Sequence, residues 1–200
     1  MGSMDIMDAI SKRRSVRKFI DKDIGRDILE KIIGAGVMAP SPKNMQNWKF
    51  IVVSGAKKGE MLDIMKKGIE NIKTIDQLSE GREYFIASLE HTMGIMKEAP
   101  VTVFVINTAN KHVLGQTMQE KFYEMANIQA IGAAIQNMLI AACGYGIGSL
   151  WISDIFFAYY DFCKWFNTDD QLVAAVSFGY FEDTVRRKKR KKLEEVVEWR

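Results

Sequence analysis

Hydrophobic residues along the chain follow two patterns, one with helical spacing and one of short continuous runs. Helical spacing is typical of amphipathic helices, and continuous β-branched runs are typical of strands buried on both faces. The first pattern predicts helices at residues 5–12, from 23 or 25 to a frayed end at Gly34 and Gly36, and at 57–73, 120–143 and 154–166. The second predicts strands at 49–53, 101–106, 149–152 and 172–178. The sequence therefore predicts one α+β domain with about four core strands and helices on both faces of its sheet.

The longest predicted helix, 120–143, is apolar nearly all round. A helix of this kind lies at the centre of a domain or of a dimer. We expect six of its residues to face inward: Ile128, Ile131, Ile135, Met138, Leu139 and Ala142. The apolar segment 128–150 is interrupted by glutamines, an asparagine and glycines, which favours a buried helix and strand over a membrane span.

Three segments lack a clear period. Residues 74–97 are polar and Met-rich, and we expect a mobile helical lid there. Residues 110–119 are predicted to form a loop or an irregular helix start. Pro40 and Pro42 exclude a regular helix, because proline lacks a donor and restricts the residue before it, so this loop is expected to be stiff.

Length and composition are those of an ordinary globular protein, with 200 residues and no internal repeat. Residues 1–3 resemble the remnant of an expression tag, which leaves 4–200 as a single domain. No apolar leader follows, so we expect a cytoplasmic protein. Cys143 and Cys163 are too few for a disulfide framework, and neither has neighbours at metal-ligand spacing. We expect no metal site and no membrane partner.

Charge is unevenly distributed. Seven of the 28 Lys and Arg residues form one run, 186–192, so the rest of the chain is mildly acidic despite a net charge of +3. Nucleic-acid-binding proteins are more often basic over a whole face, with interleaved aromatic residues. A protein that binds nucleic acid or acidic partners through this run is a competing hypothesis, which a steep salt dependence of DNA binding would support. We expect no nucleic-acid partner.

A second cationic cluster follows the first predicted helix, in the stretch Arg13-Arg14-Ser15-Val16-Arg17. Guanidinium groups offer a planar fork of donors to phosphate, and the serine hydroxyl adds a neutral donor. The stretch is therefore a candidate anion site, although such clusters are often no more than a solvated surface.

Several segments together resemble the nitroreductase family of flavoproteins. The first is the Arg13–Arg17 stretch, and the second is Ala39-Pro40-Ser41-Pro42-Lys43-Asn44-Met45-Gln46-Asn47-Trp48 before a strand. An Ala-rich helix follows, then Gly146-Ile147-Gly148-Ser149-Leu150-Trp151-Ile152, then a Leu-Glu-Glu-Val-Val ending at 193–197. The resemblance covers nearly the whole chain in the family's order.

The resemblance implies a dimeric nitroreductase-like fold, with a central, mostly antiparallel β-sheet flanked by helices. It also implies a homodimer with FMN at each of two interface sites, and NADH or NADPH as electron donor. Hydride would pass by a ping-pong mechanism through FMN to a small organic acceptor such as a nitroaromatic or a quinone. A flavin carries such chemistry itself, so no catalytic side chain is required and none is expected.

The resemblance also implies roles for individual residues. Arg13 and Ser15, with Arg14 beside them, would hold the FMN phosphate, and Lys188 and Arg190 would close over it. Arg17 would reach the pyrimidine edge of the flavin, where a fixed cation stabilises the reduced form. The Pro40 loop of the other subunit would supply Ser41 and Asn44. The backbone at Ile152 and Ser153 would lie near the flavin N5 edge.

Two positions depart from the family pattern. Asn47 stands where the family usually has proline, which would loosen the loop. At the second position the family often has Gly-Gly, and here Ser153-Asp154 stand instead; the Asp154 carboxylate would disfavour anionic substrates or narrow the site, or it simply caps the following helix. Other chemistry on the same scaffold therefore stays open, namely reductive dehalogenation, flavin fragmentation, or a flavin sensor without turnover.

Overall fold

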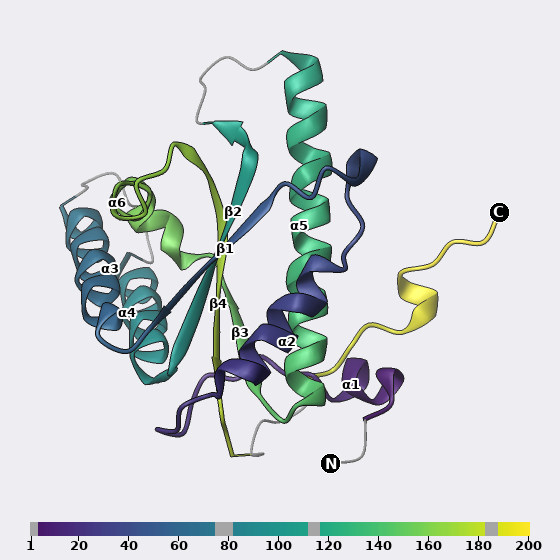
Figure 1. Ribbon diagram of the computed structural model, residues 1–200, viewed down its shortest axis with the longest axis horizontal. Coiled ribbons are helices and arrows are strands. Elements are labelled where there is room, and N and C mark those ends of the chain that lie inside the picture. Colours follow the sequence, from purple (N-terminus) through teal and green to yellow (C-terminus); the bar gives the residue numbers. More distant parts are fainter. Residues whose placement is uncertain (1–3, 75–81, 112–116, 183–187) are drawn as a thin grey trace.

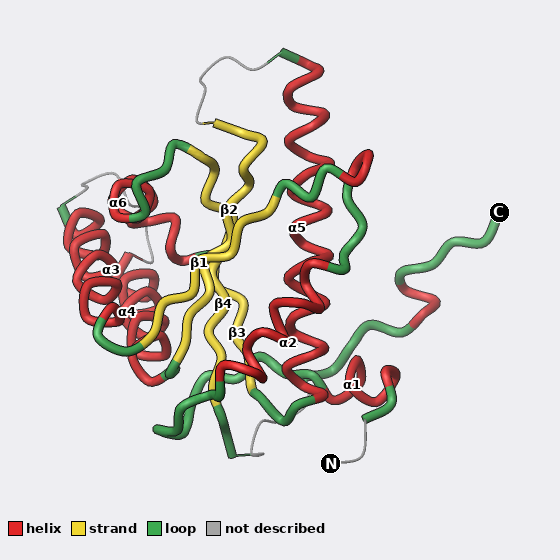
Figure 2. The backbone as a smooth tube through the Cα atoms, viewed as in Figure 1, coloured by secondary structure: helices red, strands yellow, loops and turns green. Residues whose placement is uncertain are grey.

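The computed structural model describes residues 4–74, 82–111, 117–182 and 188–200. Its centre is a four-stranded sheet in the order β1-β2-β4-β3, and every neighbouring pair is antiparallel. The four strands are β1 (Trp48–Ser54), β2 (Val101–Lys111), β3 (Gly148–Ile152) and β4 (Asp170–Gly179). Figure 2 shows them as one twisted layer between two groups of helices. The predicted α+β architecture is confirmed.

Helices cover both faces of the sheet (Figure 1). One face carries α3 (Lys57–Lys73), α4 (Arg82–Glu98), the 3-10 turn η2 (Asp154–Ala158) and α6 (Tyr159–Trp165). The other carries α2 (Arg26–Val37) and the long α5 (Met118–Gly144), with α1 (Ile6–Lys12) beside the C-terminal end of α5. Short 3-10 turns form at η1 (Pro42–Asn44) and η3 (Leu193–Glu195).

The central strand β2 explains why its sequence is apolar without alternation. Phe104 and Ile106 pack in the core under α3 and α6, whereas Val103 and Val105 pack in the core under α2 and α5. Because successive side chains point to opposite faces of a strand, a strand covered on both sides is apolar throughout.

Some predicted boundaries are wrong. Helix α2 does not fray at Gly34 and Gly36 but continues to Val37, because Gly36 packs against α5, where an added Cβ would lie 2.8 Å from the Met138 Cγ. Strand β2 reaches Lys111, so the loop predicted from residue 110 begins too early. Residues 112–116 lie outside the described part, and α5 then begins after the capping residue Thr117. The helix predicted at 154–166 is divided into η2 and α6.

Helix α4 occupies most of the predicted lid. Leu89, Ile95 and Met96 are buried, and they pack with residues of α3 and the sheet. The second half of the segment is therefore part of the core. A lid would have to come from the part before Leu89. Residues 75–81 of that part lie outside the described residues, so the lid stays a prediction.

Helix α5 is long and apolar enough to cross a membrane by length and composition alone. Five of the six residues predicted to face inward are buried among α2 and the sheet, as in the core helix of a globular domain. The sixth prediction is wrong: Ile128 is 38% exposed. It joins Phe122 and Met125, which are 66% and 62% exposed, in an exposed apolar stripe along the first half of α5.

The C-terminal residues 188–200 run away from the body of the protein (Figure 1). They hold three exposed apolar residues, Leu193, Val196 and Trp199. An extended arm that contacts little of its own chain leaves this apolar surface in water, which is unfavourable for an isolated protomer.

Candidate functional site

The Arg13–Arg17 stretch leaves α1 and runs along the free edge of β3. The Val16 amide donates to the Ser149 carbonyl at 2.9 Å, and Ser15 and Ser149 form a parallel bridge. Val16 is buried in the core at 1% exposure, which holds the stretch in register. Because paired residues of neighbouring strands point to the same face, Ser15 and Ser149 share one face, with Arg13 and Arg17 on either side of Ser15.

The three arginines differ in what they contact. Arg14 Nη1 donates to the carbonyls of Ser11 at 2.7 Å and Arg13 at 2.8 Å, so this guanidinium caps the C-terminus of α1. Arg17 makes only a long contact of 3.4 Å to the Ser15 carbonyl. Within the described residues no carboxylate pairs with Arg13, Arg14 or Arg17. The described part of the chain therefore leaves the positive charge of this stretch without a carboxylate partner.

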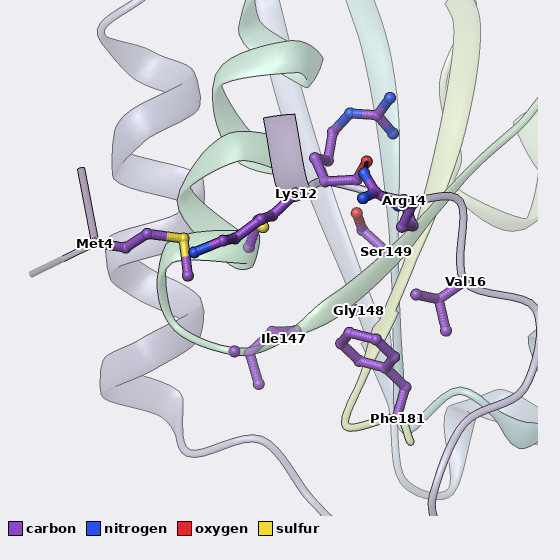
Figure 3. A pocket seen from close by; sticks show the side chains of 11 residues that line it. Met4, Lys12, Arg14, Val16, Ile147, Gly148, Ser149 and Phe181 are labelled. Carbon is purple, nitrogen blue, oxygen red and sulfur yellow. Dashed lines mark hydrogen bonds between the residues drawn. The ribbon is translucent and has the colours of Figure 1, made fainter. Parts of the chain in front are cut away.

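A pocket of about 340 Å³ opens beside these residues, between α1, the end of α5 and the start of β3 (Figure 3). Its cationic lining is Lys12, Arg13 and Arg14, of which Lys12 also pairs with Asp8 at 2.9 Å. The rest of the lining is Met4, Val16, Cys143, Gly146, Ile147, Gly148, Ser149 and Phe181. No carboxylate lines it among the described residues, so its donors suit a phosphate group. This chemistry fits the phosphate of the cofactor that the sequence implies.

The far end of β3 holds Ile152 and Ser153. Ile152 is buried, while Ser153 is exposed at the start of η2 and makes no capping hydrogen bond with its side chain. Strands rise about 3.3 Å per residue, so Ser149 and Ser153 lie about 13 Å apart along this edge. The edge can therefore hold a ligand with an anion at one end and a ring at the other.

Asp154 does not act as a helix cap. Its carboxylate accepts a hydrogen bond from the Thr92 hydroxyl of α4, which ties α4 to the end of β3. The capping interpretation of this residue is therefore wrong, and the carboxylate is already engaged within the protein.

The Pro40 loop is held in an unusual conformation. Lys43, Asn44 and Gln46 all have positive φ, near +50°, which costs free energy for residues other than glycine. The Ser41 hydroxyl accepts from the Gln46 amide at 3.0 Å, and the Asn44 side chain accepts from the Gln46 side chain at 3.3 Å. Pro40 itself is exposed. Backbone strain of this kind gathers at functional loops.

Asn47 anchors this loop instead of loosening it. Its side chain donates to buried Asn127 of α5 at 3.3 Å, and its carbonyl accepts from the Thr108 amide at 3.2 Å. The expectation that the missing proline frees the loop is therefore wrong, because the side-chain hydrogen bond to Asn127 replaces the ring as the constraint.

One protomer does not bring all the predicted site residues together. The Pro40 loop borders a second pocket, of about 530 Å³, lined by Lys43, Met45, Ala109, Glu120, Tyr123 and Asn127. That pocket lies at the first turns of α5, whereas the arginine pocket contains Cys143 at its end. About 20 residues of helix separate the two, or about 30 Å. The tip of the Pro40 loop, at Lys43 and Met45, therefore lies away from the arginine stretch of its own chain, and neither Ser41 nor Asn44 lines the arginine pocket.

Lys188 and Arg190 lie exposed in the arm. Among the described residues, no hydrogen bond or ion pair joins them to the Arg13–Arg17 stretch. Their contact with a phosphate stays a prediction.

Sequence reasoning missed two side chains of this region. Ser149 interrupts an otherwise apolar strand, and a small polar residue in such a run is the signal that could have revealed it. Thr92 has no comparable signal, because its contact with Asp154 depends on how α4 packs.

The chain is similar to known proteins in sequence and in fold. The model of the Nitroreductase family matches residues 10–180. A protein of Methanothermobacter thermautotrophicus named as an NADH dehydrogenase/NAD(P)H nitroreductase is 29% identical over 76% of this chain, and the match spans 62% of that protein. The 5,6-dimethylbenzimidazole synthase of Rhodospirillum rubrum is 28% identical over 74% of this chain and 69% of its own length.

Solved structures share the fold over almost their full length. A BluB-like flavoprotein from Clostridium difficile 630 has a TM-score of 0.82 at 26% identity, with 98% of this chain and 99% of that one covered. The FMN and NADPH-dependent nitroreductase NfnB from sphigopyxis sp. strain HMH has a TM-score of 0.74 at 20% identity, with 98% and 99% covered, and this likeness concerns the fold alone. The family match covers most of the chain, and so this protein belongs to the nitroreductase family.

Proposed function

We propose that this protein is an FMN-dependent NAD(P)H oxidoreductase of the nitroreductase type. Its electrons would pass by ping-pong hydride transfer to a small organic acceptor such as a nitroaromatic or a quinone. The observation that carries the proposal is the Arg13–Arg17 stretch docked along β3, beside a phosphate-compatible pocket. Family membership and the flavoprotein neighbour support it.

Different residues would contact different parts of FMN. Arg13 and Ser15 would hold the phosphate, with Arg14 beside them as the cap of α1 and Lys188 and Arg190 contributed by the arm. Arg17 would lie at the pyrimidine edge, and the backbone of Ile152 and Ser153 at the opposite edge of the ring. When bound, FMN supplies the redox chemistry by accepting and releasing hydride.

Arg17 would act electrostatically. A cation held beside the ring stabilises negative charge there more strongly than water does, because it needs no reorganisation. The Asp154 carboxylate accepts a hydrogen bond from the Thr92 hydroxyl, which fixes this negative charge just after the C-terminal end of β3. We infer that this carboxylate disfavours anionic acceptors.

A second copy of the chain would complete the site. The tip of the Pro40 loop borders the first turns of α5 and the arginine pocket borders its end, so a two-fold axis across the exposed stripe of α5 would bring one protomer's loop to its partner's arginines. The apolar stripe would be buried by the same contact. We therefore propose a homodimer with two shared sites.

Two measurements test the proposal. The purified protein, incubated with FMN, should show flavin absorption bands that bleach on anaerobic addition of NADH or NADPH. Arg13→Ala should lose FMN, whereas Arg26→Ala, which removes an exposed arginine paired with Glu30, should not. Absence of flavin bands after incubation with FMN would refute the proposal, and bands that persist with either nucleotide would favour a sensor without turnover.

Flavin fragmentation is a second candidate, favoured by the 28% identity to a 5,6-dimethylbenzimidazole synthase. That product has the dimethylbenzene ring that flavins also contain. Incubation of the protein with reduced FMN in air, followed by mass spectrometry, separates the two: appearance of the product supports fragmentation, and simple reoxidation supports the reductase.

A further inference from the structure

Ser149 is unusual among the buried polar residues. Five polar side chains in the described part are buried: Thr102, Asn107, Asn127, Ser149 and Ser177. Four of them have side-chain hydrogen bonds: Thr102 with Ser177 at 2.8 Å, Asn107 with Gln171 at 3.0 Å, and Asn127 with Asn47 at 3.3 Å. The Ser149 hydroxyl, at 3% exposure, has no hydrogen-bond partner among the described residues. A buried hydroxyl without a partner is unfavourable, so its retention needs a reason.

Its position supplies that reason. Ser149 lines the arginine pocket, and Figure 3 shows its oxygen directed toward the side of the pocket where Arg14 lies. It also sits beside Ser15 in the parallel bridge, on the same face. A free hydroxyl that points into a pocket lined by cations, with no acidic group in its described lining, suits an anionic acceptor.

We propose that the Ser149 hydroxyl donates a hydrogen bond to the phosphate group of FMN, within the pocket shared with Arg13. The inference rests on the proposed function and adds to it a phosphate-binding residue in β3. Within the described residues this buried hydroxyl has no hydrogen-bond partner, and the bound phosphate would provide one. Hydrogen bonds to charged groups are about twice as strong as neutral ones.

The phosphate contact can be isolated by comparing two flavins. Riboflavin has the ring and ribityl chain of FMN without the phosphate. In the full-length apoprotein, Ser149→Ala should weaken FMN binding by about tenfold to a hundredfold, the usual effect of losing a hydrogen bond to a charged group. Riboflavin binding, followed by the same fluorescence quenching, should not change.

Ser177→Ala is the matched control. It removes a buried serine hydroxyl from the neighbouring strand β4, but one that is paired with Thr102. S177A should lower the melting temperature of the apoprotein and leave the ratio of FMN to riboflavin affinity unchanged. S149A should leave the melting temperature equal or higher, because it removes an unpaired group. If S149A does not fold, Ser149→Thr and Ser149→Val, which differ by one hydroxyl, give the same comparison.

The outcomes separate this inference from the proposed function. Equal loss of both flavins, or an unchanged FMN affinity, would overturn the role of Ser149 while leaving FMN binding established. An unchanged FMN affinity with a raised KM for NADPH but not for NADH would assign the hydroxyl to the dinucleotide phosphate, which also overturns it. If the unaltered protein binds neither flavin, the proposed function and the inference both fail.

Discussion

The two faces of the sheet are covered in different ways. Under α3, α4 and α6 the core is closed within one chain, with Phe104 and Phe162 at 0% exposure and their rings 4.8 Å apart. Helix α5 covers the other face, yet its outer side leaves Phe122 and Met125 more than half exposed. The core of the first side is buried within a single protomer, although Tyr84 and Tyr160 are exposed on its outer surface, whereas on the second side exposed apolar residues follow one another along α5 itself.

This difference separates stability from assembly. Residues of the closed face lose water when one chain folds, so they stabilise the protomer itself. Apolar residues on the outer side of α5 gain the same benefit only when another surface covers them. The proposed dimer and its shared sites therefore depend on the face that the single chain leaves open.

The largest effect is expected in the closed core. Phe162→Ala removes a fully buried ring in contact with Phe104 and leaves a cavity, which should lower the free energy of unfolding by about 3–5 kcal/mol. Chemical denaturation measures the free energy of unfolding of this variant and of Phe122→Ala. Phe122→Ala, on the open face, should cost less than about 1 kcal/mol per protomer at concentrations where the protein is monomeric. Similar losses for both variants would contradict the contrast between the faces.

The second prediction tests assembly directly. Met125→Asp places a charge in the exposed stripe of α5, and burying it in a dimer would cost several kcal/mol. Analytical ultracentrifugation should show dimers for the unaltered protein and monomers for this variant, with loss of FMN binding. Tyr84→Asp is the control, since Tyr84 is 84% exposed on α4, on the closed side. If Met125→Asp stays dimeric, α5 is not the interface.

A smaller effect concerns helix packing within the closed side. In Gly68→Ala, the new Cβ would lie 2.7 Å from the Ala158 Cβ and 2.8 Å from the Phe157 carbonyl, so α3 must separate from η2. Overpacking of this kind costs about 1–3 kcal/mol. Gly94→Ala in α4 has nothing within 4 Å of the new Cβ and should instead stabilise by about 0.5–1 kcal/mol. Thermal melts of the two variants should shift in opposite directions.

The smallest effect is a pH dependence at the start of α5. Hydrogen bonds from Thr117 lower the pKa of Glu120 below its usual 4.5, in a capping box. A carboxyl whose pKa is lowered by folding stabilises the protein above its unfolded pKa, and this contribution is lost as pH falls through the folded pKa. Glu120→Gln should therefore lower the melting temperature slightly at pH 7, and the difference should shrink below pH 4.5. A difference that is independent of pH would show that the carboxylate is not involved.

Local pattern was sufficient for most elements. The helix 57–73 coincides with α3, and the apolar run from Val101 lies in β2 with both faces buried as expected. Hydrophobic spacing and strong β-branched runs determine these elements because each pattern suits only one period. Local sequence was also sufficient for the Arg13–Arg17 stretch, because its residue types alone indicate an anion-binding site.

Other features depended on packing between distant segments. Gly34 and Gly36 did not fray α2, because the contact of Gly36 with α5 outweighs the low helix propensity of glycine. Part of the expected lid became core, since Ile95 and Met96 pack on α3 and the sheet. Asn47 and Asp154 found partners on α5 and α4 that lie 80 and 62 residues away along the chain.

What the sequence determined by itself is therefore the order of elements, the family, and the kind of ligand that its arginines suit, because these depend on residue type and local spacing. Only the tertiary structure decided which residues meet. It set Ser149 beside Ser15 with no side-chain partner among the described residues, and it placed the tip of the Pro40 loop at the first turns of α5, away from the arginine pocket at the end of that helix. Contacts between distant segments arise from the packing of whole elements, and no local pattern records them.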